Sequence, residues 1–193
     1  IQNAIVAGSG VGLPQGIINA ACTVSQAKDT TSSPNQAADT FVYRNVVDMW
    51  NRMYAPCRQR AVWLINPDLE SQLDLMRFDT NRSSTQPVPV YLPAGGASAT
   101  PYATLKGRPV IPVESCSAIG DVGDVVLADM SQYLTVIKSG GIRQDVSIHL
   151  FFDYDTSAFR FIFRVAGMPW WGSAITLPNS TSTRSCFVTL AAR

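Results

Sequence analysis

The sequence predicts an α+β fold, in which an antiparallel-rich sheet packs against two helices and is joined to part of a second β-rich domain. The first observation is the stretch 105–171, where at least five short apolar runs are each bounded by Gly, Asp, Ser or Pro. That punctuation is typical of successive strands joined by tight turns. The second observation is apolar residues at helical spacing over 38–54 and 67–77.

The clearest strand candidate, Phe159–Val165, alternates Phe-Arg-Phe-Ile-Phe-Arg-Val. A period of two places one set of side chains on a single face, namely Phe159, Phe161, Phe163 and Val165. In a preceding strand candidate, the same period places four apolar side chains on one face, namely Val146, Ile148, Leu150 and Phe152. Between them, Asp153 and Asp155 predict a hairpin turn rather than a calcium loop, which would need more oxygen ligands and a Gly at its sharp turn.

The N-terminal part predicts a short strand, a turn and a loop. Residues 1–7 form a short apolar strand candidate, and glycines follow at 8, 10, 12 and 16. The G-x-G-x-x-G nucleotide pattern fails in both registers because positions 13 and 15 are Leu and Gln, so 8–17 is predicted to be a structural turn. The polar segment 23–38 is predicted to be an exposed loop.

The helix predicted over 38–54 stops at Ala55-Pro56, because the residue before a proline disfavours the helical conformation. Its apolar stripe consists of Val42, Val46, Met49, Trp50 and Met53. A buried strand over 61–65 leads to the second helix, which Asn66 can cap and whose first turn suits Pro67. The buried stripe of that helix consists of Leu69, Leu73 and Met76.

The remaining segments connect these elements. The stretch 79–104 is long and irregular, with four Pro and a Gly-Gly pair, and loops of this kind are usually functional or disordered. Residues 176–183 are predicted to be a linker and 185–190 a last short strand. Trp170-Trp171 is predicted to pack at a junction of two subdomains or against a neighbouring subunit. Three carboxylates are predicted to be turn and strand-end residues, namely Asp121, Asp124 and Asp129.

Composition limits the classes of function. The 193 residues make one large domain or two small ones. Hydrophobic residues make up 46% and charged residues only 15%, which indicates that much of the surface contacts other protein. The formal net charge of +1 gives no electrostatic case for a nucleic-acid or membrane binder. Twelve Arg outnumber three Lys, and Arg suits interfaces, although each one alone is equally an ordinary surface residue.

The four cysteines are widely spaced, at Cys22, Cys57, Cys116 and Cys186, and form no C-x-x-C. They predict free, mostly buried thiols in a cytosolic protein rather than disulfides. No apolar run approaches the about 20 residues that span a bilayer, and no signal peptide is visible. Because the chain starts at Ile1 without Met, we expect an N-terminal portion to be missing.

Motifs for catalysis and metal binding are weak. The single histidine, His149, lies in a strand candidate, and no zinc site is expected without a second His. Residues Ser25–Lys28 match S-x-x-K, and Ser33–Asn35 and Lys138–Gly140 faintly match the other two boxes of penicillin-recognising enzymes. The match is poor, because Ser25 lies in a predicted loop rather than at a buried helix start. A serine hydrolase using Ser25 and Lys28 is a remote alternative.

Four short sequence motifs occur one after another along the chain, and their order carries information about the family. They are a Gly-rich loop at 8–17, a Gly-x-Pro-Val segment at 107–110, a Gly-Asp segment ending in Tyr at 123–133, and Arg followed by Gly at 164–167. The set resembles the C-terminal half of tailed-bacteriophage major capsid proteins of the Hong Kong 97 phage fold. The resemblance runs from about Ile5 to about Leu177.

The resemblance implies a division into four parts: 1–19 as a peripheral-domain strand and Gly-rich loop, 20–136 as an axial domain, 137–177 as the return strands of the peripheral domain, and 178–193 as a C-terminal tail. It implies a structural subunit of a phage or prophage icosahedral capsid, assembling into pentamers and hexamers that enclose the genome. An encapsulin-like cargo compartment, which shares the fold, is the alternative.

The implied partners are other copies of the chain, as capsomer neighbours, and packaged DNA through weak non-specific contacts. The resemblance implies no membrane, small-molecule substrate, cofactor, metal or catalytic residue. The protein would reside in the virion capsid and, during assembly, in the host cytoplasm.

In this family, an N-terminal arm, an extended loop and a spine helix would precede Ile1, and the loop at 79–104 would project toward the capsomer axis. Since the peripheral sheet packs on the spine helix, we expect the isolated chain to self-associate or to pack this sheet poorly, without forming closed shells. Some members crosslink through a Lys–Asn isopeptide bond assisted by a Glu. The strand at 159–164 has no carboxylate, so no autocrosslinking is expected.

Overall fold

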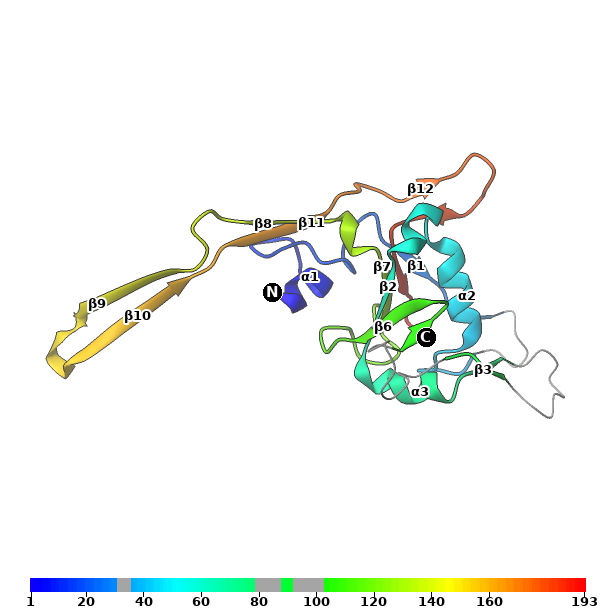
Figure 1. Cartoon of the computed structure of the whole chain (residues 1–193), viewed down its shortest axis with the longest axis horizontal. Helices are drawn as coiled ribbons and strands as arrows, with labels where there is room; N and C mark the ends of the chain where they lie inside the picture. The colour runs from blue at the N-terminus through cyan, green and yellow to red at the C-terminus, as the bar shows by residue number, and fades with distance from the viewer. Residues whose placement is uncertain (31–35, 79–87, 92–102) are drawn as a thin grey trace.

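The structure, a computed structural model, describes residues 1–30, 36–78, 88–91 and 103–193. The predicted α+β class is confirmed, since a six-stranded sheet combines with a few short helices. The molecule is elongated: a body that holds this sheet lies at one end, and a narrow two-stranded projection extends from it (Figure 1).

The body is organised around a sheet of mixed pairing. Its strands, in spatial order, are β1 (Val24–Gln26), β14 (Phe187–Leu190), β7 (Val125–Ala128), β2 (Val62–Ile65), β6 (Arg108–Pro112) and β5 (Thr104–Leu105). The pairs β1–β14 and β2–β6 are parallel, and the other three neighbouring pairs are antiparallel. Every residue of β7 and β14 is buried, which explains why these segments are nearly continuous apolar runs.

The first predicted helix is confirmed over its central part, as α2 (Tyr43–Arg52). It begins later than predicted because the Asn45 side chain accepts a hydrogen bond from the backbone N–H of Val42 at 3.1 Å, which fixes the start of the helix. The buried face of the stripe is Val46, Met49 and Met53. The helix ends at Met53, and Ala55–Gln59 follows as a short 3-10 helix, η1.

Asn66 caps the second helical segment as predicted, because its side-chain oxygen accepts the backbone N–H of Asp68 at 3.0 Å. The predicted stripe is also confirmed, with Leu69, Leu73 and Met76 all buried. The segment is shorter than 67–77, however. It consists of a 3-10 turn, η2 (Pro67–Leu69), and α3 (Glu70–Asp74).

The helix stops short because the following residues join a small sheet. Strand β3 (Arg77–Phe78) pairs antiparallel with β4 (Val88–Pro89). The prediction for the 79–104 loop falls mostly on residues 79–87 and 92–102, which lie outside the described residues.

The predicted N-terminal strand is wrong: Gln2–Ala7 forms a helix, α1. Short apolar runs do not distinguish the two conformations, and here the helix buries Val6 against the body. The Gly-rich segment is a turn, as predicted. Gly8 has no room for a side chain, since an added Cβ would lie 2.2 Å from the Pro14 carbonyl oxygen.

Two further segments pair where loops were predicted. The expected loop at 23–38 contains β1, which lies beside β14. The expected linker at 176–183 is the turn region of a small hairpin formed by β12 (Ile175–Thr176) and β13 (Thr183–Arg184). The last strand predicted over 185–190 is confirmed as β14, which places part of the segment 178–193 in the interior of the main sheet.

The C-terminal residue Arg193 is fixed by a buried ion pair. Its guanidinium donates to both carboxylate oxygens of Asp124, at 3.0 and 2.5 Å, and both side chains are fully buried. Asp124 also accepts the backbone N–H of Gly120 at 3.1 Å. This pair ties the end of the chain to the segment that precedes β7.

The thiols give a first prediction. All four cysteines are free and buried, and burial raises the pKa of Cys57 to about 11 and that of Cys116 to about 12. These two thiols are therefore almost wholly protonated near neutral pH, whereas a hydrogen bond with Cys186 lowers the pKa of Cys22. Because all four sulfur atoms are buried, we expect the native chain to react with Ellman's reagent at pH 8 at least about 100-fold more slowly than the urea-unfolded chain. Equal absorbance time courses before and after unfolding would contradict this.

Candidate assembly surface

Residues 133–169 leave the body as the narrow projection of Figure 1, here named the β-arm. Strand β8 (Tyr133–Ile137) pairs antiparallel with β11 (Val165–Pro169) near the body. Beyond them, β9 (Arg143–Phe151) pairs antiparallel with β10 (Thr156–Ile162) out to the tip. The β-arm is thus two small sheets placed end to end.

The predicted single strand Phe159–Val165 is wrong, because it is interrupted between the two sheets. Strand β10 ends at Ile162 and β11 begins at Val165. On the opposite side, Gly140 and Gly141 take positive φ values of 98° and 59°, which turn the chain between β8 and β9. We name this break together with the strand ends that flank it, residues 138–143 and 162–164, the elbow.

The base of the β-arm is fixed to the N-terminal turn. The Tyr133 hydroxyl donates to the Gln15 carbonyl at 2.8 Å, and the Gln15 backbone N–H donates to the Gly167 carbonyl at 2.8 Å. Gly167 is needed here because an added Cβ would lie 2.8 Å from the Tyr133 hydroxyl oxygen. These contacts fix the direction in which the β-arm leaves the body.

The two adjacent tryptophans have different surroundings. Trp171 packs edge-to-face against Tyr54, with ring centroids 5.5 Å apart, and its indole N–H donates to the Gln132 side chain at 3.2 Å. This confirms the predicted packing at a junction, here between the β-arm and the body. Trp170 remains 67% exposed.

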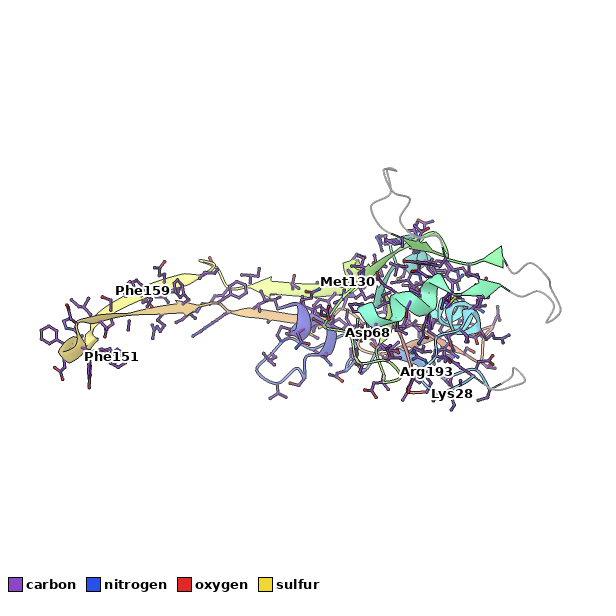
Figure 2. The ribbon with its side chains drawn as sticks, turned by 90° about the horizontal axis from the view of Figure 1, so that it is seen from below. Lys28, Asp68, Met130, Phe151, Phe159 and Arg193 are labelled. Carbon is purple, nitrogen blue, oxygen red and sulfur yellow. The ribbon has the colours of Figure 1, made fainter. Side chains whose placement is uncertain are left out.

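Apolar side chains of the distal hairpin face solvent. Val146 is paired with Phe159, so both lie on one face of the hairpin, and Phe161 shares that face. Their exposed fractions are 54%, 61% and 65% (Figure 2 labels Phe159). Of the predicted face, Phe159 and Phe161 are confirmed to lie together, whereas Phe163 lies in the break after Ile162 and Val165 begins the next strand. We define the Phe face as Val146, Phe159 and Phe161. A lone two-stranded hairpin is marginally stable, and a large exposed apolar patch marks an interaction site.

A bulge in β9 shows that the second predicted face, which runs from Val146 to Phe152, is not continuous. The pairing jumps from Thr156–Phe151 to Ala158–Ser147, so the two strands are out of step between these pairs. The bulge interrupts the alternation predicted to link Val146 with the following apolar residues, which are exposed: Ile148, Leu150 and Phe152. Bulges of this kind twist the edge of a sheet and limit unwanted pairing there.

The charges of the β-arm are separated along its length. Asp145 and Arg160 form an exposed ion pair at 2.9 Å near the elbow end of the hairpin, two residues from Arg143. A hollow at the elbow is lined by Lys138, Ser139, Gly141, Arg143, Ile162 and Arg164. This basic set was not predicted from the sequence, although three basic residues flank the hairpin segment.

The tip of the β-arm is acidic. Asp153 lies in a 3-10 turn, η4 (Phe152–Tyr154), and Asp155 follows it with a φ of +50°. This confirms the hairpin turn that the sequence predicted for Asp153 and Asp155. Both residues are exposed.

Two of the three segments that match penicillin-recognising enzymes lie in different parts of the structure. Ser25 is exposed on β1, not in the predicted loop, and Lys28 lies on the body (Figure 2). Lys138, from the third box, lies at the elbow of the β-arm. Ser33–Asn35 fall outside the described residues. Among the described residues, Ser25 and Lys138 are therefore not brought together.

His149 and the other predicted chemistry-bearing residues have structural surroundings. His149 is exposed on β9, and within the described ranges no group of three or more His, Cys, Asp or Glu could hold a metal ion. Asp129 is buried and caps the 3-10 helix η3 (Met130–Gln132) by accepting the backbone N–H of Ser131 at 3.1 Å. None of the helices in the described part of the chain combines the length and apolar character needed to cross a membrane.

A comparison with models of known families shows to which family this chain belongs. The family model described as the phage capsid family matches residues 1–179. The chain belongs to the phage capsid family. The match extends slightly beyond the range over which the sequence motifs showed a resemblance. The comparison with curated proteins finds no match.

Solved structures agree with this family assignment at the level of the fold. The chain is similar to the capsid of an empty GTA particle and to that of a native GTA particle, both computed with C5 symmetry. Each likeness has 18% sequence identity and a TM-score of 0.65, and covers 99% of this chain and 60% of the other. The described chain therefore has a phage-capsid fold and spans about 60% of the capsid chains that it matches.

Proposed function

We propose that this chain is a structural subunit of a phage or prophage shell, which assembles with copies of itself into pentamers and hexamers around a genome. The observation that carries the proposal is the β-arm, whose Phe face is exposed in the isolated chain. A capsid-family fold with a projecting apolar ribbon suits repeated contact between subunits. The five-fold symmetry of the two similar capsids supports pentamer formation.

The physical role of this chain is surface burial rather than catalysis. Burying each exposed Phe would contribute roughly 1.5–3 kcal/mol, and every copy carries the same surface. Identical contacts repeated around an axis close into a ring when the rotation allows it. DNA would be enclosed through weak contacts that read no bases, in agreement with the net charge of +1. The protein would then reside in the virion capsid, after assembly in the host cytoplasm.

The test of this function is the composition of the particles formed by the complete gene product. We expect particles that sediment as closed shells and, when isolated from phage-producing cells, carry nuclease-protected DNA. Shells that instead retain a defined protein cargo would indicate an encapsulin-like compartment. A hydrolase activity that is lost in Ser25→Ala would contradict the structural role.

The composition of β10 gives a second prediction, which concerns covalent maturation. No Asp or Glu occurs between Thr156 and Ile162, so the strand offers no carboxylate to assist an isopeptide bond. We expect mature particles to run as a single monomer band on denaturing gels after boiling. A ladder of covalent oligomers would contradict this.

A further inference from the structure

We propose that the β-arms of two copies of this chain lie side by side in opposite directions, with the acidic tip of each seated in the basic elbow of the other. This inference rests on the proposed function and names the geometry of one of its contacts. A second copy of this chain is thus the occupant of the elbow hollow.

The elbow has a concentration of positive charge without an acidic partner. Lys138, Arg143 and Arg164 line one hollow, all three are exposed, and no carboxylate lines it. Among the described residues, none of the three takes part in an ion pair. Like charges held together repel, so an anionic group that enters the hollow is favoured, and guanidinium groups bind carboxylates particularly well.

The acidic tip of a second copy of the chain supplies that anionic group. Neither Asp153 nor Asp155 takes part in an ion pair within the described part of the chain, and Tyr154 between them is 79% exposed. The tip cannot reach its own elbow, because β9 has nine residues and a strand rises about 3.3 Å per residue, which separates the two ends by roughly 30 Å. The contact is therefore intermolecular.

When the two β-arms run in opposite directions, both tip–elbow contacts can form at once, because each copy offers one tip and one elbow. Such a contact is isologous, whereas the contacts that close a ring are heterologous. A shell also needs contacts that join one ring to the next, and an isologous contact between two β-arms can supply such a contact. Arg143 is paired with Ile162 and therefore lies on the face opposite to Phe161, so the charges can be changed without altering the Phe face.

Zero-length carbodiimide crosslinking tests the contact directly, because it joins a carboxylate to an amine only when the two touch. We expect a crosslinked dimer whose peptides join Lys138 to Asp153 or Asp155, and the three Lys of the chain make the assignment simple. Lys138→Arg is the matched control. It keeps the charge but cannot form the amide, so it should lose the crosslink and keep the association.

A charge exchange tests the same geometry in solution. The tip variant is Asp153→Lys with Asp155→Asn, since Asn tolerates the positive φ, and the elbow variant is Lys138→Glu with Arg143→Glu. Each alone should associate about 10-fold or more weakly in sedimentation velocity, while their equimolar mixture should recover the wild-type affinity. Exchanging the internal pair, Asp145→Arg with Arg160→Asp, should change nothing.

The possible outcomes distinguish failure of the tip–elbow contact from failure of the proposed function. If the mixture does not recover, if both variants associate like the wild type, or if Lys138 crosslinks to another carboxylate, the tip–elbow contact is overturned while self-association through the Phe face stands. An oligonucleotide that binds the wild type and not the elbow variant, with association unchanged, also overturns it. A wild-type chain that stays monomeric overturns both.

Discussion

A chain carrying Phe159→Asp and Phe161→Asp is expected to remain monomeric at concentrations where the wild-type chain associates. Both side chains are more than half exposed in the isolated chain, so the substitution costs little within one copy. Burying each Phe on association would contribute roughly 1.5–3 kcal/mol, and a carboxylate resists burial, so association should weaken by at least about 100-fold. Size-exclusion chromatography with light scattering measures the change.

The control places a single added negative charge on the other face of the same hairpin, against two in the test variant. Ser147 is paired with Ala158 and alternates with Val146, so Ser147→Asp alters the opposite face. We expect this variant to associate like the wild type. Equal loss in both variants would mean that added charge, rather than the Phe face, controls association.

Removing one partner of the buried Asp124–Arg193 pair is expected to cause the largest loss of stability. Asp124→Ala leaves a fully buried guanidinium without its carboxylate and the Gly120 N–H without its acceptor. Such a loss costs about 3–5 kcal/mol. At roughly 2–4 °C per kcal/mol for a chain of this size, Tm should fall by roughly 6–20 °C in calorimetry.

Two matched variants show whether an unpaired charge causes that loss. Asp124→Leu with Arg193→Met removes both charges and should cost less than Asp124→Ala alone. Arg160→Met breaks the exposed Asp145–Arg160 pair, whose side chains are 45% and 70% exposed, and should cost under about 1 kcal/mol. If Asp124→Ala is as mild as Arg160→Met, the buried pair does not stabilise the fold as argued.

The sequence predicted elements whose cause is local. Asn66 caps its helix because the acceptor and donor lie two residues apart, and the hairpin turn at Asp153–Asp155 follows from adjacent residues. The face shared by Phe159 and Phe161 followed from a period of two. The family resemblance rested in the same way on short motifs, which the match over 1–179 confirms.

The sequence did not predict features that arise from distant partners. Strand β1 pairs with β14, more than 160 positions away, and a three-residue run such as Val24–Gln26 carries no local sign of this pairing. The break after Ile162 reflects glycines on the opposite strand. Asp124 lies at the bend before β7, as predicted, but its buried ion pair was not predicted because its partner, Arg193, is 69 positions distant.

Reconstruction by electron cryomicroscopy of the particles formed by the complete gene product tests the central claim most directly. We predict a closed shell in which Phe159 and Phe161 are buried and the tip of each β-arm contacts a neighbouring subunit. Failure to form closed shells, or a shell in which the β-arm projects freely into solvent, would contradict the account.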